Sequence, residues 1–504
     1  MVSAYQIIFD KFSNKMNSYI RVTFLVALPV PESKVTLAVS LLFSAIICHL
    51  IWTRYHGGLH RIPGPFLASI SSFWKWHVIW QEDMPMRSVH LHEKYGPLVR
   101  IGPNHVSASS PEAIRVIYVE NRGFPKATTY GILQPQLDGY YDLHNIFSTQ
   151  DPTIVDMSAW LQFYAFDSLL DVMFSKQIGF LATGSDVDGI CEFDHQMMVY
   201  FSIWSQVPKL ERIISRWKSL TGSLKPNPLY SFILNLVDDR VSQPDESNDM
   251  LSWLLRLHRD TPDKLSVREV IGAVYIINVC ESYSSSIRTL DTVSPPSSIA
   301  AHDVTAITLR TVFYHLSRSP AIHRKLYDEI AEADRLGLIS HPARHSEVSS
   351  APYLSAVINE ALRIHPGVGT IPERVVPRGG VELHGVEIPE GTITIIGVHT
   401  WAVNRSKEIF GEDVECFRPE RWIDNAPEKL QSMRKNTFTW GAGARGCIGK
   451  NVAMLQMLPI IVELYRHFDF NPADAQKDWH VSGTWITRQT QMDMIVSKKR
   501  QDKE

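Results

Sequence analysis

Apolar and polar positions along the chain separate an uncharged N-terminal segment from a long body of predicted helices. Residues 35–52 contain no Asp, Glu, Lys or Arg and, at ~1.5 Å rise per residue, are long enough to cross a bilayer. Residues 198–268 are patterned as helices with a polar break at 242–249, and an apolar segment that ends near residue 467 predicts another helix. Residues 95–106 instead alternate around glycine and proline, which predicts a β-hairpin.

A further apolar stretch, residues 270–279, predicts a buried helix that is interrupted and then resumes. The interruption covers residues 281–298, which are rich in serine and include two adjacent prolines that cannot continue a helix. Helical patterning returns at residues 300–310. The pattern therefore predicts two helical pieces separated by a loop.

The chain is predicted to form one large domain behind an N-terminal appendage. Its 504 residues would by length alone suggest several domains, but no internal repeat or low-complexity run divides it. We divide it into an extension at 1–34, a transmembrane anchor at 35–53, a basic and proline-containing hinge at 54–65, and a domain at 66–504. Basic residues in the hinge favour a cytosolic position for the large domain, and basic residues before the anchor weaken that bias.

Composition excludes some classes of function. A net charge of −3, with 20% charged residues, gives no sign of nucleic-acid binding. The five cysteines are few, odd in number and widely scattered, so no disulfide framework is predicted and a reducing compartment is favoured. With 44% hydrophobic residues, the chain can build a large core.

The most specific chemical signal is a glycine-rich stretch around Cys447, at residues 440–449. Its glycines let the backbone approach a flat ligand closely. A helix that begins just after the cysteine directs its free N–H groups and positive dipole end toward the sulfur, which favours the thiolate. A thiolate held in this way suits an iron porphyrin. The alternative is a buried, inert cysteine.

This stretch resembles the haem-binding loop of the cytochromes P450, aromatic-x-x-Gly-x-Arg-x-Cys-x-Gly. The fixed positions fall on Trp440, Gly443, Arg445, Cys447 and Gly449, with tryptophan where the family usually has phenylalanine. The resemblance implies haem b, with its iron bound by Cys447. It also implies a mainly α-helical P450 fold with a small β portion, over most of the chain from about residue 62.

A second stretch, residues 300–305, is similar to the family's oxygen-activation motif. Asp303 matches its acid, which can relay protons to bound dioxygen. The family's hydroxyl position is Val304 here, and Thr305 is adjacent but ~100° around a helix. The resemblance therefore implies that Asp303 and Thr305 are catalytic, while His302 is expected to be a packed or solvated histidine rather than a ligand. An ordinary helix carboxylate is the alternative for Asp303.

Other residues gain roles only through the resemblance. Glu360, Arg363 and Arg421 are similar to the family's buried charge network, which is structural. Arg374 is implied to bind a haem carboxylate together with Arg445. The implied substrate pocket is mostly small or apolar, which suits a hydrophobic substrate. It comprises Ala301, Val368, Thr370 and Trp485.

The chain departs from the family pattern in two places. Between Trp76 and Trp160 no Trp or His is followed four residues later by Arg, the pair with which the family binds a haem propionate. The fold is therefore predicted to lack the propionate-binding helix. The loop at about 281–298 is predicted to be an insertion in the distal helix, which is unbroken in the family. Our hypothesis is that these departures mark an imperfect gene model or a decayed paralogue.

The resemblance implies a monooxygenase that inserts one atom of O2 into a lipophilic small molecule, with electrons from NADPH–cytochrome P450 reductase. It is strongest to filamentous-fungal P450s of the pisatin-demethylase and benzoate-hydroxylase kind, which favours secondary metabolism. An anchor before a proline hinge is similar to microsomal members, which implies a single-pass protein of the endoplasmic reticulum membrane, in contact with lipid, with a cytosolic catalytic domain. Two alternatives stay open, a catalytically impaired remnant and a haem-thiolate isomerase or dehydratase.

Overall fold

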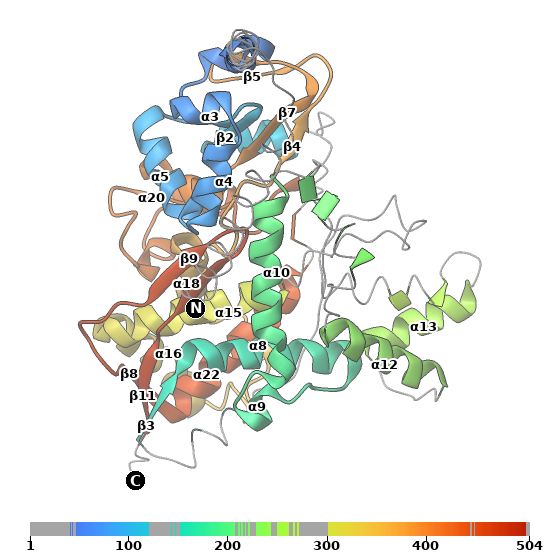
Figure 1. Ribbon diagram of the computed structural model, residues 1–504. Helices are drawn as coiled ribbons and strands as arrows, with labels where there is room; N and C mark the ends of the chain where they lie inside the picture. The colour runs from blue at the N-terminus through green and yellow to red at the C-terminus, as the bar shows by residue number, and fades with distance from the viewer. Residues whose placement is uncertain are drawn as a thin grey trace. The chain divides into compact units, whose positions relative to one another are not determined.

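The structure is a computed structural model with two units, Met1–His56 and Gly57–Glu504, each described by itself (Figure 1). The described residues are 41, 43, 47–119, 143, 147, 152–206, parts of 210–221, 228–242, 249–261, parts of 266–271, 301–443, 446, 447 and 449–499. Most of the predicted anchor lies outside them. Within these ranges, no helix combines the length and the apolar character that crossing a membrane requires.

The described residues of the second unit form four small sheets, the largest in the strand order β1-β2-β7-β4. β1 and β2 confirm the predicted hairpin, β2 pairs in parallel with β7, and β7 pairs antiparallel with β4. An antiparallel sheet has the order β3-β11-β8, and two further pairs join β9 to β10 and β5 to β6. The strands are β1 Leu98–Gly102, β2 His105–Ala108, β3 Thr153–Asp156, β4 Arg374–Val376, β5 Val381–Leu383, β6 Val386–Ile388, β7 Gly391–Val398, β8 Phe468–Pro472, β9 His480–Gly483, β10 Thr487–Thr490 and β11 Asp493–Lys498.

Helices predominate, so the predicted mainly α-helical fold with a small β portion is confirmed. The α-helices are α3 Phe66–Ile70, α4 Phe73–Trp80, α5 Met84–Tyr95, α6 Pro111–Ile114, α8 Met157–Phe174, α9 Phe180–Thr183, α10 Ile190–Trp204, α12 Pro228–Ser242, α13 Met250–Asp260, α15 Ala301–Arg318, α16 Pro320–Arg335, α17 His345–Val348, α18 Pro352–Ile364, α19 Thr400–Val403, α20 Lys407–Phe410, α21 Pro427–Asn436 and α22 Lys450–His467. Short helices of other types are η2 His56–Arg61, η3 Arg115–Val119, η4 Val187–Gly189 and η6 Pro419–Trp422.

The helix α15 lies in the largest hydrophobic core, in contact with α8, α18 and α22 (Figure 1). Leu309, Val312, Phe313 and Leu316 are at most 1% exposed. Their spacing of three and four residues puts them on one face of the helix, which buries that face in the core. Burial of this face fixes the position of α15, whose first turns carry the candidate catalytic residues.

Both predicted departures from the family fall outside the described residues, at 120–151 in large part and at 281–298. After the first of these ranges, β3 leads directly into α8. The Asp156 carboxylate caps α8 by accepting a hydrogen bond from the Ser158 N–H at 2.9 Å. After the second, α15 begins at Ala301, where the sequence predicts that helical patterning resumes; the side chain of Ala301 is outside the described set.

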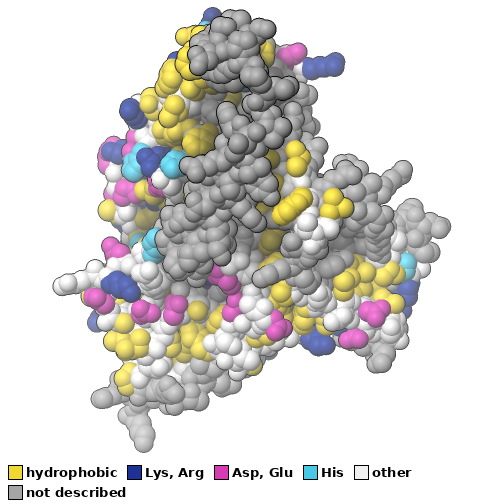
Figure 2. Space-filling view, in the orientation of Figure 1, with side chains coloured by type: hydrophobic (Ala, Val, Ile, Leu, Met, Phe, Trp, Pro, Cys, Tyr) yellow, Lys and Arg dark blue, Asp and Glu magenta, His cyan; other side chains and the backbone are white. Residues whose placement is uncertain are grey.

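Hydrophobic side chains gather on the surface of the second unit over α3 and α4 (Figure 2). Each of four large ones is about half to two-thirds exposed: Phe66, Leu67, Phe73 and Trp80. A contiguous apolar patch of this kind usually marks a surface that contacts another molecule or a membrane.

Candidate active site

Cys447 lies in a tight loop that follows Phe438 and ends where α22 begins. The Cys447 N–H donates to the Trp440 carbonyl at 2.7 Å, and the Gly446 N–H donates to the Gly443 carbonyl at 3.1 Å. Gly443 has a φ of +60°, a left-handed conformation that glycine adopts without strain. The loop therefore turns back on itself at Gly443, where the backbone conformation favours glycine.

The chemistry of this loop fits a haem iron. The Cys447 side chain is exposed, and no disulfide joins the cysteines of the described residues. Gly449 is the N-cap of α22 and offers no side-chain cap, so the first N–H groups of the helix and its positive dipole end favour a nearby anion. A thiolate is such an anion and is a soft ligand suited to iron. Arg445 lies outside the described residues.

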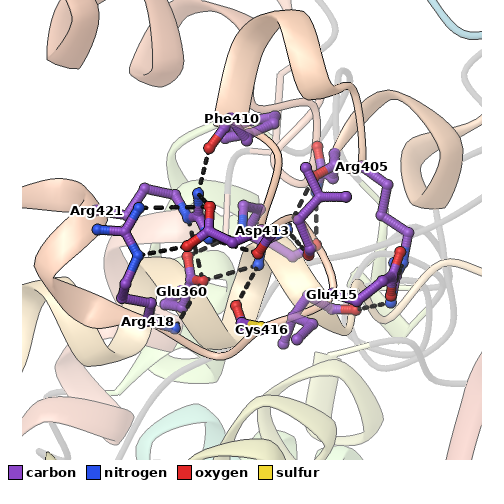
Figure 3. A network of polar contacts seen from close by, with 12 residues as sticks. Glu360, Arg405, Phe410, Asp413, Glu415, Cys416, Arg418 and Arg421 are labelled. Atoms are coloured by element: carbon purple, nitrogen blue, oxygen red, sulfur yellow. Dashed lines mark hydrogen bonds and ion pairs between the residues drawn. The ribbon is translucent and has the colours of Figure 1, made fainter.

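Glu360 of α18 is the centre of a buried charge network (Figure 3). Arg363 donates to both carboxylate oxygens, at 2.7 and 2.9 Å, and Arg421 Nε lies 3.3 Å from Oε1. The side chains of these three residues are fully buried. Asp413 adds a second carboxylate, 2.7 Å from Arg421 Nη1. The buried guanidinium groups of Arg363 and Arg421 are thus paired with the buried Glu360 carboxylate and with Asp413, which is about one-third exposed.

The same network holds the backbone of the segment that precedes the cysteine loop. Arg363 donates to the carbonyls of Val414 at 2.7 Å and Cys416 at 3.1 Å, and Trp422 Nε1 donates to Glu360 Oε2 at 2.9 Å. Burial by itself raises the pKa of Glu360, but hydrogen bonds and charges from the arginines outweigh burial and hold this pKa below its usual value. The carboxylate therefore stays ionised at neutral pH and ties α18 to this segment.

Arg374, the described candidate for binding a haem carboxylate, packs on Tyr118 of η3. The guanidinium carbon lies 5.0 Å from the ring centroid. The Tyr118 hydroxyl donates to the Pro372 carbonyl at 2.7 Å and accepts from the Val398 N–H at 3.2 Å, and burial raises its pKa to about 12. The centroid of the Tyr118 ring also lies 4.8 Å from that of Phe438, just before the cysteine loop. Tyr118 therefore links Arg374 to that loop, a role that no local motif signals.

The candidate pocket is apolar where α15 meets the connection between β9 and β10. Val304 clusters with Ile486 and Trp485, and Val368 forms an isolated β-bridge with Ile486. Two of the predicted pocket residues, Val368 and Trp485, are thus brought together at Ile486, against which Val304 also packs. Thr370 is buried, and no described residue hydrogen-bonds its hydroxyl group.

Thr305 and Asp303 both belong to α15, but their side chains contact different helices. The Thr305 hydroxyl donates to Oε1 of Gln456 on α22, at 3.4 Å. Asp303 Oδ1 accepts from Gln162 Nε2 of α8 at 2.8 Å, and Gln162 Oε1 accepts from Arg310 at 2.7 Å. The Asp303 carboxylate is therefore held in one orientation by an anchored amide. No local sequence pattern signals Gln162, because the pairing joins residues that are 141 positions apart.

His302 is a packed histidine, 1% exposed, which is one of the two states that the sequence left open. Its Nδ1 is 2.6 Å from Gln162 Nε2, its Nε2 is 3.2 Å from Asp194 Oδ2, and its ring stacks on Phe166 with centroids 4.0 Å apart. Asp194, His302 and Asp303 also bring one donor atom each within 4.8 Å. Hydrogen bonds to neighbouring side chains already engage these donors, so we assign no metal ion to them.

Comparison with known proteins identifies the family of this chain. A family model for cytochrome P450 matches residues 141–495. Cytochrome P450 monooxygenase pkfB of Emericella nidulans is 30% identical over 529 residues, which cover 93% of this chain and 96% of that protein. Cytochrome P450 monooxygenase cicH of the same organism is 28% identical over 494 residues, covering 89% and 95%. Pisatin demethylase of Fusarium vanettenii is 29% identical over 498 residues, covering 88% and 92%. The chain therefore belongs to the cytochrome P450 family of haem b-dependent oxygenases, among relatives from fungi.

Proposed function

We propose that this chain is a haem-thiolate monooxygenase that inserts one atom of O2 into a lipophilic small molecule. The observation that carries the proposal is the loop in which Cys447 stands, three residues before the start of α22. The Glu360 network supports it, because it anchors the segment before this loop. When bound, haem b supplies the iron at which O2 is activated, and a thiolate ligand favours cleavage of the O–O bond.

Within this proposal, Cys447 holds the iron, and Arg374 and Arg445 hold the haem carboxylates. Tyr118 keeps the Arg374 guanidinium in place through its ring. The aromatic and glycine positions of the loop, Trp440, Gly443 and Gly449, let its backbone lie close to a flat ring.

Asp303 is proposed to hold and pass the protons that oxygen activation consumes. Val304 supplies no hydroxyl, and the Thr305 hydroxyl is engaged with Gln456. At the position where the motif has a hydroxyl next to the acid, this chain therefore has only the acid, Asp303, followed by the hydrocarbon side chain of Val304. Proton delivery in this chain depends on Asp303 and water.

The apolar candidate pocket supports a hydrophobic substrate. Two similar fungal proteins are named as monooxygenases and another as pisatin demethylase, which supports oxidation of a small molecule. We extend this to fungal secondary metabolism, by analogy with those relatives.

Electrons are proposed to come from NADPH–cytochrome P450 reductase, at the endoplasmic reticulum membrane. A single-pass anchor at residues 35–53 would hold the large domain in the cytosol. The exposed apolar side chains over α3 and α4 support contact with lipid, because a patch of that kind is unfavourable in water (Figure 2).

The test is the absorbance difference spectrum of the reduced, carbon-monoxide-bound protein in microsomes. Thiolate ligation gives a characteristic red-shifted Soret band, which Cys447→Ala should abolish while an exposed-site control, Cys48→Ala, should retain it. Absence of the band from well-expressed wild-type chain would overturn the proposal and favour the impaired remnant.

Val304 favours a second candidate, a haem-thiolate isomerase or dehydratase, because such an enzyme needs no hydroxyl for oxygen activation. Val304→Thr separates the two. A monooxygenase should transfer more of its NADPH electrons into product and release less hydrogen peroxide. An isomerase should convert its substrate without NADPH and at a rate that the substitution leaves unchanged.

A further inference from the structure

A small cavity lies beside Asp303, between α8, α10, α15 and the β9–β10 connection. Its volume is about 20 Å³, which is room for a single water molecule. Most of the polar groups around it are charged or titratable. The lining includes Gln162, His195, Met198, Asp303, Arg310 and Arg488.

The Asp303 carboxylate is held at this cavity. Gln162 Nε2 donates a hydrogen bond to Asp303 Oδ1. Arg310 in turn donates to Gln162 Oε1, and its guanidinium group also donates to the Ser158 carbonyl at 2.6 and 2.8 Å. The Asp303 side chain still keeps 21% of its surface accessible. An oriented carboxylate with an accessible edge can accept a proton from a water molecule in the cavity.

His195 of α10 lines the same cavity and is partly exposed. Near it, Arg488 Nη1 is 3.7 Å from Glu192 Oε2, and both of these side chains are about one-third exposed. Burial lowers the pKa of His195, and the charge of Arg488 lowers it further. The carboxylates of Asp303, Glu82 and Glu192 raise this pKa, but by less, so the pKa stays below its usual value. The imidazole is therefore neutral at pH 7. A neutral imidazole can take up a proton on one nitrogen while it releases the proton on the other.

We propose that His195 passes protons from solvent, through a water molecule in this cavity, to the Asp303 carboxylate. The proposal rests on the monooxygenase function, which needs such a supply. In each transfer, the ring gains a proton from solvent at one nitrogen and gives the proton of its other nitrogen to the water, which protonates Asp303. The ring then turns or exchanges tautomer, so the net change is one proton moved inward.

Two features of this chain favour that route and single out His195. Val304 stands at the hydroxyl position of the motif and packs closely against Gly367, where an added Cβ would be 2.9 Å from a Val304 methyl group. His302 is the other histidine near Asp303, but it is 1% exposed, and Asp194 and Gln162 occupy its two nitrogens. His302 therefore secures α10 to α15 and has no access to solvent.

The first test compares NADPH oxidation by His195→Phe and wild type, each with reductase and with its carbon monoxide spectrum recorded. Loss of a positioned proton donor should slow the proton-limited rate by roughly tenfold or more and enlarge the solvent isotope effect. Asp303→Asn should do the same, and the double variant should lose little beyond either single one. His90→Phe, which changes an exposed histidine of α5, is the matched control. A normal spectrum with equal rates for His195→Phe and His90→Phe would overturn the relay.

A second measurement needs no turnover. In protein labelled at histidine, the NMR signal that disappears in His195→Phe identifies His195, and its titration is then followed in Asp303→Asn. Because the Asp303 charge raises the pKa of His195, its removal should lower that pKa further. An unchanged titration would show that the two groups do not share the cavity and would overturn the relay. If His195→Phe fails to fold, His195→Gln takes its place. A wild-type chain without the thiolate band overturns the monooxygenase function instead, so the two failures are distinct.

Discussion

Replacing Glu360 by glutamine tests whether the buried charge network is what holds the haem-loop core. The substitution keeps size and shape but removes one negative charge. Glu360 is the acceptor of five hydrogen bonds of 3.3 Å or less, of which two come from Arg363 and one from Arg421. In Glu360→Gln, the fully buried Arg363 guanidinium loses its ion-pair partner, and an amide N–H₂ is turned toward groups that are all donors.

Breaking a buried ion pair by changing one partner destabilises a protein by about 3–5 kcal/mol. Since folded proteins are stable by only about 5–15 kcal/mol, this is a large fraction of the total. A loss of about 4 kcal/mol raises the unfolded population by roughly a factor of 10³. We therefore expect much less haem-loaded protein and a clearly lower midpoint of urea unfolding.

The chain contains a matched control in Glu332 and Arg335. They have the same spacing of three residues and an N–O distance of 2.6 Å, against 2.7 Å for Glu360 and Arg363, but they are more than half exposed. Glu332→Gln should leave the free energy of unfolding nearly unchanged, because an ion pair exposed to water contributes little. Circular dichroism in urea and the carbon monoxide spectrum measure both variants. Equal effects of the two substitutions would refute the reasoning from burial.

Two further predictions concern haem retention and pH. Tyr118→Leu removes the ring beneath Arg374 and should speed transfer of haem to apomyoglobin severalfold. Tyr118→Phe keeps the ring and should transfer haem more slowly than Tyr118→Leu. Equal transfer rates for the two variants would contradict the role given to the ring. Burial lowers the pKa of His315 from 6.5 to about 4. The contribution of the buried, neutral histidine to stability is therefore complete above pH 6.5. Up to about 3 kcal/mol of that stability is lost as the pH falls toward 4. His315→Phe keeps the stack on Phe417, whose centroid is 4.3 Å away, and should flatten the fall of the urea midpoint between pH 7 and 4; an unchanged slope would count against this assignment.

Features that are encoded over a few neighbouring residues could be predicted from the sequence. Glycine spacing around Cys447 predicted a loop that turns into a helix, and the observed loop closes through hydrogen bonds between residues at most seven positions apart. The alternation around glycine and proline predicted the β1–β2 hairpin for the same reason. The helical offset between Val304 and Thr305 indicated that the two side chains face different directions, because a helix rotates ~100° per residue.

Pairings between distant segments could not be predicted in this way, because they form only when the chain is folded. Tyr118 packs under Arg374, and Gln162 orients Asp303, across separations of more than a hundred residues. A polar side chain such as Gln162 has many equivalent partners in an unfolded chain, and it acquires one only when α8 is packed against α15. The cavity next to His195 is likewise a space left between packed helices and strands, which no single segment contains. Local spacing thus fixes which chemistry the chain can carry, and packing fixes which side chains serve it.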